Sequence, residues 1–342
     1  MLRILPYLVI TVCVLLSCTS KIDSLTENKI KIRGVNLVAP PEPFDPVYFD
    51  SLVELGVSHV AVVPFGFSRK GSQRVIYNHE KQWWGEKDEG VFKTIELAHE
   101  HGLQVLLKPH MWISGEGWPG DFFIEDDFID QWFNEYNQYI LHYANIADSM
   151  NVEMLSIGNE LRKLAINYPA YWKNLIEKTR AVYKGKLIYS ANWDNYTQIS
   201  FWQDLDYVGI NAYFPLPKNR IEELTDLESI KDSWSPWVRE LNEFNSKVNK
   251  PIIFTEFGYM SKDDSYNGHW LVSDSAYDEE DQALAYDALL SVFRSKDWWN
   301  GGYSWKYFMK SIPREEYYRR DAFIFQGKKA EKILKKHYST GY

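Results

Sequence analysis

Cysteine is almost absent from this chain. Its 342 residues include two cysteines, Cys13 and Cys18, and both lie close to the N-terminus. A domain that begins after residue 18 has no thiol, which excludes disulfide bonds, thiolate metal sites and a cysteine nucleophile. The histidines and carboxylates show no spacing typical of a metal site either. We therefore expect a fold stabilised by its own core, and an activity that needs no metal and no cofactor.

Positive charge is scarce as well. Lys and Arg number 38 against 47 Asp and Glu, so the formal net charge is −9. Binding to phosphate backbones requires a basic face, and this balance argues against nucleic acid as a partner. The proportions of charged (25%) and apolar (45%) residues are typical of a globular protein. The length suits one large domain or two small ones, and we predict a single catalytic domain that acts as a monomer.

The chain begins with an apolar run. Arg3 precedes "ILPYLVITVCVLLS", which ends at Ser17 and is followed by Cys18. This run is short for a membrane span and has the pattern of a signal peptide. "LLSC" resembles the bacterial lipobox, whose cysteine becomes the lipidated first residue of the mature protein; an ordinary signal peptide or an uncleaved anchor are the alternatives. We predict a lipoprotein signal peptide at 1–17, a polar tether at 18–29 and a catalytic domain at 30–342.

This leader predicts export to the bacterial cell envelope, with the protein anchored to a membrane through its N-terminal lipid only. The sequence leaves open which membrane holds the lipid and whether the domain faces the periplasm or the cell surface.

Aromatic residues, in contrast, are abundant, with 14 Trp, 23 Tyr and 18 Phe. Most are expected in the core, where large side chains bury much apolar surface. Others suit a cleft, because aromatic faces match the C–H faces of sugar rings.

From residue 30 onward, short apolar runs rich in β-branched residues alternate with amphipathic helical patterns. Continuously apolar strands indicate a parallel sheet covered on both faces. We predict an α/β fold, a (β/α)8 TIM barrel. A doubly wound open sheet is the rival, but no Gly-rich dinucleotide turn follows the first strand. The eight expected strands are 31–37, 57–65, 103–110, 152–159, 186–192, 206–214, 251–257 and 301–308.

Two of these strands end on glutamate. Glu160 follows the strand at 152–159, and Glu256 lies at the end of 251–257. Each alone has a structural explanation, as a first-turn helix carboxylate or as a buried, paired one. Chemistry in such barrels lies at the carboxyl ends of the strands, and these two strands would face each other across the mouth. Two facing carboxylates in different environments suit glycoside hydrolysis.

The same residues carry a resemblance to a known group. Asn159-Glu160 after the fourth strand, with a second Glu ending the seventh, resembles glycoside hydrolase clan A, the retaining (β/α)8 glycosidases. The finer resemblance is to glycoside hydrolase family 113, whose known activity is β-1,4-mannan hydrolysis. That family often has Thr where this chain has Asn159. The matching segments, in order, are "LLKPHMW", "MLSIGNELR", "INAYFPL", "FTEFGY" and "FQGKKAEKIL", and they cover nearly all of 30–340.

The resemblance implies roles for several residues. Glu160 would be the acid/base and Glu256 the nucleophile. Asn159 would bind the sugar 2-hydroxyl, or the carboxylate, and Trp305 would form the floor of the same subsite. Tyr213, near the end of its strand, is a candidate donor to Glu256. Core packing is the alternative for both Trp305 and Tyr213.

Other strand ends supply candidate lining residues. A lysine in an apolar strand needs a partner or a wet cavity, so Lys108 and His110 are expected to face the mouth, where they would bind sugar hydroxyls or tune a carboxylate. The long connections 66–88 and 112–125 carry tryptophans and would form walls or further sugar subsites. Further candidates for lining residues are Asn36, Trp112, Asn192 and Trp193.

The sequence therefore predicts a retaining β-glycoside hydrolase that cleaves β-1,4-mannan or manno-oligosaccharides by double displacement. A β-glucan or β-mannoside hydrolase, or a transglycosylase with the same machinery, is the alternative within enzymes. A non-catalytic sugar-binding surface lipoprotein is the alternative from another class. Endo or exo action stays open.

Overall fold

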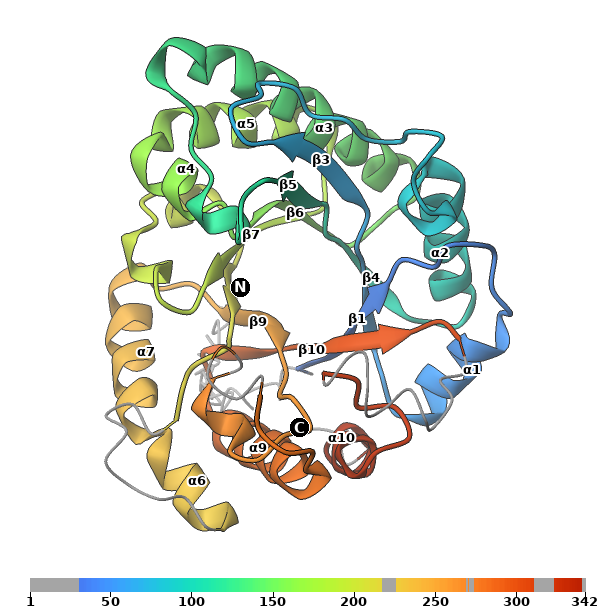
Figure 1. Ribbon diagram of the computed structural model, residues 1–342, viewed down its shortest axis with the longest axis vertical. Coiled ribbons are helices and arrows are strands. Elements are labelled where there is room, and N and C mark those ends of the chain that lie inside the picture. Colours follow the sequence, from blue (N-terminus) through green and yellow to red (C-terminus); the bar gives the residue numbers. More distant parts are fainter. Residues whose placement is uncertain (1–30, 217–225, 269, 271–273, 311–322, 340–342) are drawn as a thin grey trace, which may run out of the picture.

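The computed structural model describes residues 31–216, 226–268, 270, 274–310 and 323–339 (Figure 1). The expected signal peptide, the lipidation site Cys18 and the tether lie outside these residues. Among the residues described, no helix is long and apolar enough to cross a membrane.

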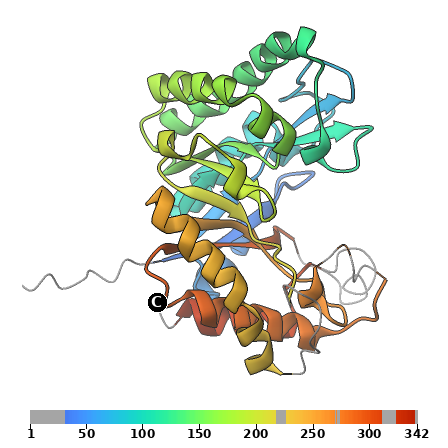
Figure 2. The same cartoon turned by 90° about the vertical axis from the view of Figure 1, so that its left-hand side faces the viewer.

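Eight parallel strands close into a barrel, which confirms the predicted (β/α)8 fold. Seen from the side, the strands run through the centre and the helices lie outside them (Figure 2). In their order around the barrel, the strands are β1 (Ile32–Val38), β10 (Trp299–Phe308), β9 (Ile252–Phe257), β8 (Val208–Asn211), β7 (Lys186–Asn192), β6 (Met154–Asn159), β4 (Gln104–Leu107) and β2 (His59–Val62).

Helices cover the outer face of this barrel, as Figure 1 shows. The connection between β7 and β8 contains only short 3-10 turns, at Tyr196–Gln198 and Trp202–Asp204. The described α-helices are α1 (Val47–Glu54), α2 (Asp88–Glu100), α3 (Ile129–Ser149), α4 (Arg162–Asn167), α5 (Pro169–Val182), α6 (Leu227–Ser233), α7 (Ser235–Val248), α9 (Glu279–Phe293) and α10 (Lys329–Ser339).

The longest of these helices shows how the sequence buries its aromatic residues. Trp132, Tyr136, Tyr139 and Tyr143 of α3 recur every three or four residues, so they share one face of the helix. All four are fully buried in the layer between the helices and the barrel. Most of the aromatic excess therefore belongs to the core, as expected.

A second core fills the barrel itself. Side chains alternate along each strand, so one set faces the helices and the other faces inward. The inward set forms a separate buried cluster of Ile32, Ala61, Val63, Leu106, Met154, Ile188, Ile253 and Tyr303.

Two further strands follow the carboxyl ends of β2 and β4. The expected strands at 57–65 and 103–110 are each interrupted by a proline, Pro64 and Pro109, whose nitrogen cannot donate to a ladder. The chain then resumes as β3 (Phe65–Arg69) and β5 (His110–Ser114), which pair in parallel outside the barrel. The long connections at 66–88 and 112–125 therefore begin as ordered strands, which the sequence analysis did not predict.

Barrel closure between β1 and β10 depends on a glycine. Gly301 has φ +97°, and a Cβ there would lie 2.2 Å from the Ile32 carbonyl oxygen. Gly71 has a similar φ of +75°, but a Cβ there would meet no atom within 4 Å.

We expect Gly71→Ala to lower the free energy of unfolding by about 1–2 kcal/mol through backbone strain. Gly301→Ala should cost roughly 3 kcal/mol or more, because the clash adds to this strain. Urea titration of both variants tests this, and equal losses would contradict it.

Candidate active site

Glu160 and Glu256 lie at the same end of the barrel, next to one pocket. Glu256 belongs to β9, and Glu160 comes directly after the last residue of β6. Both line a pocket of about 440 Å³. Its other lining residues are mostly aromatic: Trp118, Asn192, Trp193, Asp194, Tyr213, Trp270, Trp305 and Phe323.

Glu256 is held by donors on both of its carboxylate oxygens. The Lys108 ammonium donates to Oε1 at 2.5 Å, and the Tyr213 hydroxyl donates to Oε2 at 2.7 Å. The Nε2 atom of His110 lies 3.6 Å from Oε1. The Glu256 residue is buried, so these hydrogen bonds replace most of its contact with water. Donors on both oxygens, one of them an ammonium group, fix the position and orientation of this side chain.

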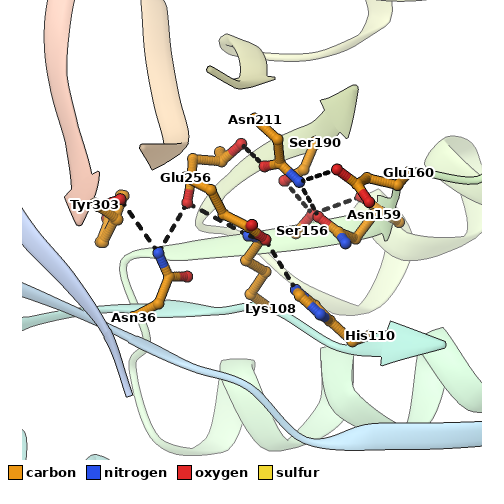
Figure 3. A network of polar contacts seen from close by, with 12 residues as sticks. Asn36, Lys108, His110, Ser156, Asn159, Glu160, Ser190, Asn211, Glu256 and Tyr303 are labelled. Carbon is orange, nitrogen blue, oxygen red and sulfur yellow. Dashed lines mark hydrogen bonds and ion pairs between the residues drawn. The ribbon is translucent and has the colours of Figure 1, made fainter. Parts of the chain in front are cut away.

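Lys108 lies beneath Glu256, inside the barrel mouth (Figure 3). It is fully buried, and its Nζ also donates to the Thr255 carbonyl oxygen at 3.3 Å. Burial lowers the pKa of Lys108 below its usual value, although the Glu256 carboxylate acts in the opposite direction. Of the two roles expected for Lys108, the structure fits contact with a carboxylate, because a buried ammonium cannot reach sugar hydroxyls.

His110 is buried behind Trp305 and does not itself line the pocket. Its ring stacks on Trp305, with ring centroids 5.9 Å apart and planes 4° apart. Burial lowers the pKa of His110 well below its usual value, and the charge of Lys108 lowers it further. A neutral imidazole beside the indole supports Trp305, which itself lines the pocket.

Glu160 occupies a different environment. Asn211 Nδ2 donates to its Oε1 at 3.0 Å, and Trp118 Nε1 donates to its Oε2 at 2.8 Å. Burial and the nearby Glu256 charge together raise the pKa of Glu160 to about 7, although the two hydrogen bonds act to lower it. Its backbone has φ +55°, a left-handed conformation that is uncommon outside glycine and is often found at functional sites.

Asn211 connects the two halves of the site. This residue ends β8 and is fully buried. Besides Glu160, its Nδ2 donates to Asn159 Oδ1 at 3.0 Å, while its Oδ1 accepts from Thr255 Oγ1 at 2.8 Å (Figure 3). The Asn211 amide therefore forms hydrogen bonds with Glu160, with Asn159 before it, and with Thr255, which precedes Glu256. It fixes the orientation of the Asn159 amide at the pocket edge.

Trp118 reaches Glu160 from the connection that follows β5. A Cβ at Gly120 would lie 2.3 Å from the Trp118 ring, so glycine is needed where the indole folds back over the chain. The Arg162 guanidinium lies 4.6 Å from the centre of the same ring. Arg162 also bonds Asp121 at 2.8 Å and Asp194 at 3.1 Å. These contacts hold the indole where it can donate to Glu160.

Two expected lining residues lie elsewhere. Asn36 is fully buried, and its Nδ2 donates to the carbonyl oxygens of Thr255 and Tyr303 at 3.1 and 3.3 Å. It supports the strand that carries Glu256 and does not line the pocket. Trp112 lines a separate hollow, because alternation along β5 turns its side chain outward between the buried Met111 and Ile113. Expectations for Asn36 and Trp112 as lining residues of this pocket were therefore wrong.

Trp193 and Asn192, in contrast, line the pocket as expected. The Trp193 ring stacks on that of Trp270, with centroids 5.4 Å apart and planes 1° apart. Within the described ranges, no group of three or more His, Cys, Asp or Glu could hold a metal ion.

The sequence analysis missed several residues of this site. Asn211 could have been found, because a polar residue inside the expected strand 206–214 needs a partner. Trp118 lies in the connection 112–125, which was expected to form walls or sugar subsites, and it lines the pocket; its bond to Glu160 was not predicted. The remaining residues, Asp194, Trp270 and Phe323, come from irregular connections, where no periodic pattern indicates which side chains turn inward.

A (β/α)8 barrel that sets two glutamates in contrasting environments within an aromatic pocket has the architecture of a glycoside hydrolase. The comparisons with known proteins agree. The model of Glycoside Hydrolase Family 113 matches residues 47–328, and the chain belongs to this family. The protein is therefore a glycoside hydrolase.

Solved structures share the fold. A family 113 β-mannanase from Alicyclobacillus acidocaldarius is 24% identical with a TM-score of 0.78, and the match covers 91% of this chain and 97% of that one. A family 113 β-1,4-mannanase is 22% identical with a TM-score of 0.75, covering 91% and 99%. A β-D-glucuronidase of Dictyoglomus thermophilum is 17% identical with a TM-score of 0.60, covering 91% and 50%. A search of the curated proteins found no match.

Replacing Trp118 tests the electrostatics of Glu160. Trp118→Phe removes a hydrogen bond that stabilises the carboxylate, so the pKa of Glu160 should rise above about 7. Trp193→Phe is the matched control, because it removes an indole from the same pocket and Glu160 keeps both of its donors. Carbon-13 NMR titration of labelled glutamate measures both variants. An unchanged or lower pKa in Trp118→Phe would contradict the assignment.

Proposed function

We propose that this protein is a retaining β-glycoside hydrolase that cleaves β-1,4-mannan or manno-oligosaccharides by double displacement, with Glu256 as nucleophile and Glu160 as acid/base. The observation that carries the proposal is the contrast between the two glutamates of one pocket. Glu256 accepts from an ammonium and a phenol hydroxyl, whereas burial and the neighbouring charge raise the pKa of Glu160 to about 7. A retaining glycosidase needs this pairing of an ionised and a protonated carboxyl group.

In the first step, a Glu256 oxygen attacks the anomeric carbon and the bond to the leaving oxygen breaks. Glu160 donates its proton to that oxygen, so the aglycone leaves as an alcohol. The product is a glycosyl ester on Glu256. Because a buried carboxyl group with a pKa of about 7 keeps its proton in a substantial fraction of molecules at neutral pH, Glu160 suits this step.

In the second step, water attacks the anomeric carbon while Glu160 accepts a proton, and the bond to Glu256 breaks. Ester formation has by then removed the negative charge of Glu256, one of the two causes that raise the pKa of Glu160. The pKa of Glu160 therefore falls in the intermediate. A larger fraction of Glu160 is then ionised and able to accept a proton when a base is needed.

Family membership and the pocket support mannan as the substrate. Two of the similar solved structures are described as a β-mannanase and a β-1,4-mannanase. The bond from Asn211 to Asn159 Oδ1 orients the Asn159 amide nitrogen for a sugar 2-hydroxyl, a contact that strengthens in the transition state of this chemistry. A β-glucan hydrolase or a transglycosylase would use the same two glutamates. The non-catalytic alternative is disfavoured because both glutamates and their donors are in place.

The N-terminal sequence supports a location for this activity. We propose that the chain is exported, carries lipid on Cys18 and acts on polysaccharide as a membrane-anchored monomer of the cell envelope. Labelling with a radioactive fatty acid should mark the wild-type protein and fail to mark Cys18→Ser.

The stereochemistry of the product tests the mechanism. Mannohexaose hydrolysis followed by proton NMR should show the β-anomer first, with the α-anomer appearing later by mutarotation. Release of the α-anomer first would reject double displacement. Separation of the products from mannohexaose and from polymeric mannan decides between endo and exo action, and faster cleavage of β-1,4-glucan would favour the alternative substrate.

Replacing Glu256 tests the nucleophile. Glu256→Gln keeps the size of the side chain but cannot form the glycosyl ester, so kcat on mannan should fall by more than about 10³-fold. Circular dichroism should show a folded protein. Glu153→Gln serves as the control, because Glu153 lies at the amino end of β6, away from the pocket, and activity should be kept. Near wild-type activity of Glu256→Gln would contradict the assignment.

A further inference from the structure

Two exposed tryptophans lie outside the catalytic pocket and have no part in the mechanism above. Trp112 is 60% exposed and Trp83 is 52% exposed, the highest values among the large apolar side chains that the structure describes. Both line one hollow of about 440 Å³, together with Ile76, which is 49% exposed. Exposed apolar groups scattered singly need no explanation, but a cluster around one hollow indicates a binding surface.

Ordered backbone presents both indoles. The strands β3 and β5 run side by side (Figure 1). Trp112 of β5 pairs with Phe67 of β3, and its side chain is exposed between the buried Met111 and Ile113. The segment after Trp83 is fixed against the chain that follows β1. Trp84 N donates to Pro41 O at 3.1 Å and Gly85 N to Pro40 O at 2.8 Å. Rigid aromatic faces can bind a ligand at little cost in conformational entropy.

Polar side chains complete the hollow. His79, Lys81, Gln82 and Glu86 line it beside the two indoles. Gln82 is itself fixed, because its Nε2 donates to the Phe65 carbonyl oxygen at 2.8 Å and its Oε1 accepts from His79 N at 2.7 Å. Because Lys81 is basic and Glu86 is acidic, the hollow does not carry charge of one sign only. Flat apolar faces beside neutral and mixed hydrogen-bonding groups match an uncharged polyhydroxylated chain better than an ionic partner.

The hollow also continues toward the catalytic side of the molecule. Trp83 lines a second hollow, of about 420 Å³, whose wall includes Val38 at the end of β1 and Phe308 at the end of β10. The same strand β10 carries Trp305 into the catalytic pocket. Trp83 therefore links the first hollow to a second one at the carboxyl ends of barrel strands, the end at which the catalytic pocket lies, so an extended chain can cross more than one of them.

We propose that Trp83 and Trp112 form a second carbohydrate-binding surface, which holds a distant part of the same β-linked polysaccharide chain whose cleavage takes place at Glu160 and Glu256. The surface increases the affinity for long chains and leaves the chemical step unchanged. This proposal rests on the proposed function for the choice of polysaccharide.

Affinity electrophoresis in gels that contain soluble β-1,4-mannan tests the surface. The double variant Trp83→Ala/Trp112→Ala should bind the polymer on the order of tenfold more weakly than wild type, because truncation of exposed aromatic anchors typically costs that much. The double variant with Phe at both positions should recover most of the retention. Phe92→Ala is the matched control, because it removes a partly exposed aromatic side chain of α2 outside both hollows.

Kinetics with long and short substrates supply the second readout. For the Ala double variant, KM on polymeric mannan should rise about tenfold with kcat unchanged, while kcat/KM on mannotriose stays at the wild-type value. Unchanged retention and unchanged KM on the polymer would overturn the proposal. An equal loss on mannotriose would overturn it too, since the effect would then belong to the catalytic pocket.

Failure of the second surface and failure of the proposed function give different results. If the wild-type protein binds mannan in the gel but does not hydrolyse it, the proposed function fails while the surface stands. If it hydrolyses mannan and the Ala double variant binds as tightly as wild type, the surface fails alone. Retention in β-1,4-glucan gels and none in mannan gels would reject mannan as the occupant.

Discussion

A buried ion pair sits at the centre of this molecule and constrains what surrounds it. The Lys108 ammonium is fully buried and donates to Glu256 at 2.5 Å. Neither charge is stable there alone, because removing one partner of such a pair leaves an uncompensated charge and typically costs about 3–5 kcal/mol. The strands β4 and β9 must therefore present these side chains to each other, and the barrel that closes between them is what keeps this geometry.

That pair also shapes the second carboxyl group. Within the described residues, Glu160 accepts hydrogen bonds from two neutral donors, and burial and the negative charge of Glu256 raise its pKa to about 7 against the more distant charge of Lys108. The two glutamates therefore differ in their donors, since Glu256 accepts from an ammonium and a phenol hydroxyl and Glu160 from an amide and an indole. In the mechanism that we propose, neutralising Glu256 in an ester intermediate would lower the pKa of Glu160 at the step that requires a base.

Much of this could be predicted from the sequence where a periodic pattern carries the information. The barrel followed from eight apolar runs, and the positions of Glu160 and Glu256 followed from the rule that barrel strands present function at their carboxyl ends. The prediction that Tyr213 donates to Glu256 is confirmed by their hydrogen bond. Each of these inferences concerned a residue that lies in a barrel strand or within two residues of its end.

The errors have the same origin. Trp112 was assigned to the pocket because the sequence does not show that Pro109 ends one strand and that β5 begins a separate sheet with its own alternation. Asn36 is polar and lies two residues before the end of β1, but it faces two buried carbonyl oxygens. Trp118 and Trp270 lie in connections, where direction is decided by contacts such as that between Trp118 and Arg162. No local pattern in the sequence encodes such contacts.

The central claim is that Glu256, held by Lys108 and Tyr213, attacks the sugar, while Glu160 donates a proton in the first step and accepts one in the second. Covalent trapping tests it most directly. The protein is incubated with a 2-deoxy-2-fluoro-β-mannosyl fluoride, digested and mapped by mass spectrometry, because the fluorine slows hydrolysis of a glycosyl-enzyme ester. The account predicts one stable glycosyl adduct on Glu256. An adduct on Glu160, or turnover of mannan with no adduct on any carboxyl group, would contradict it.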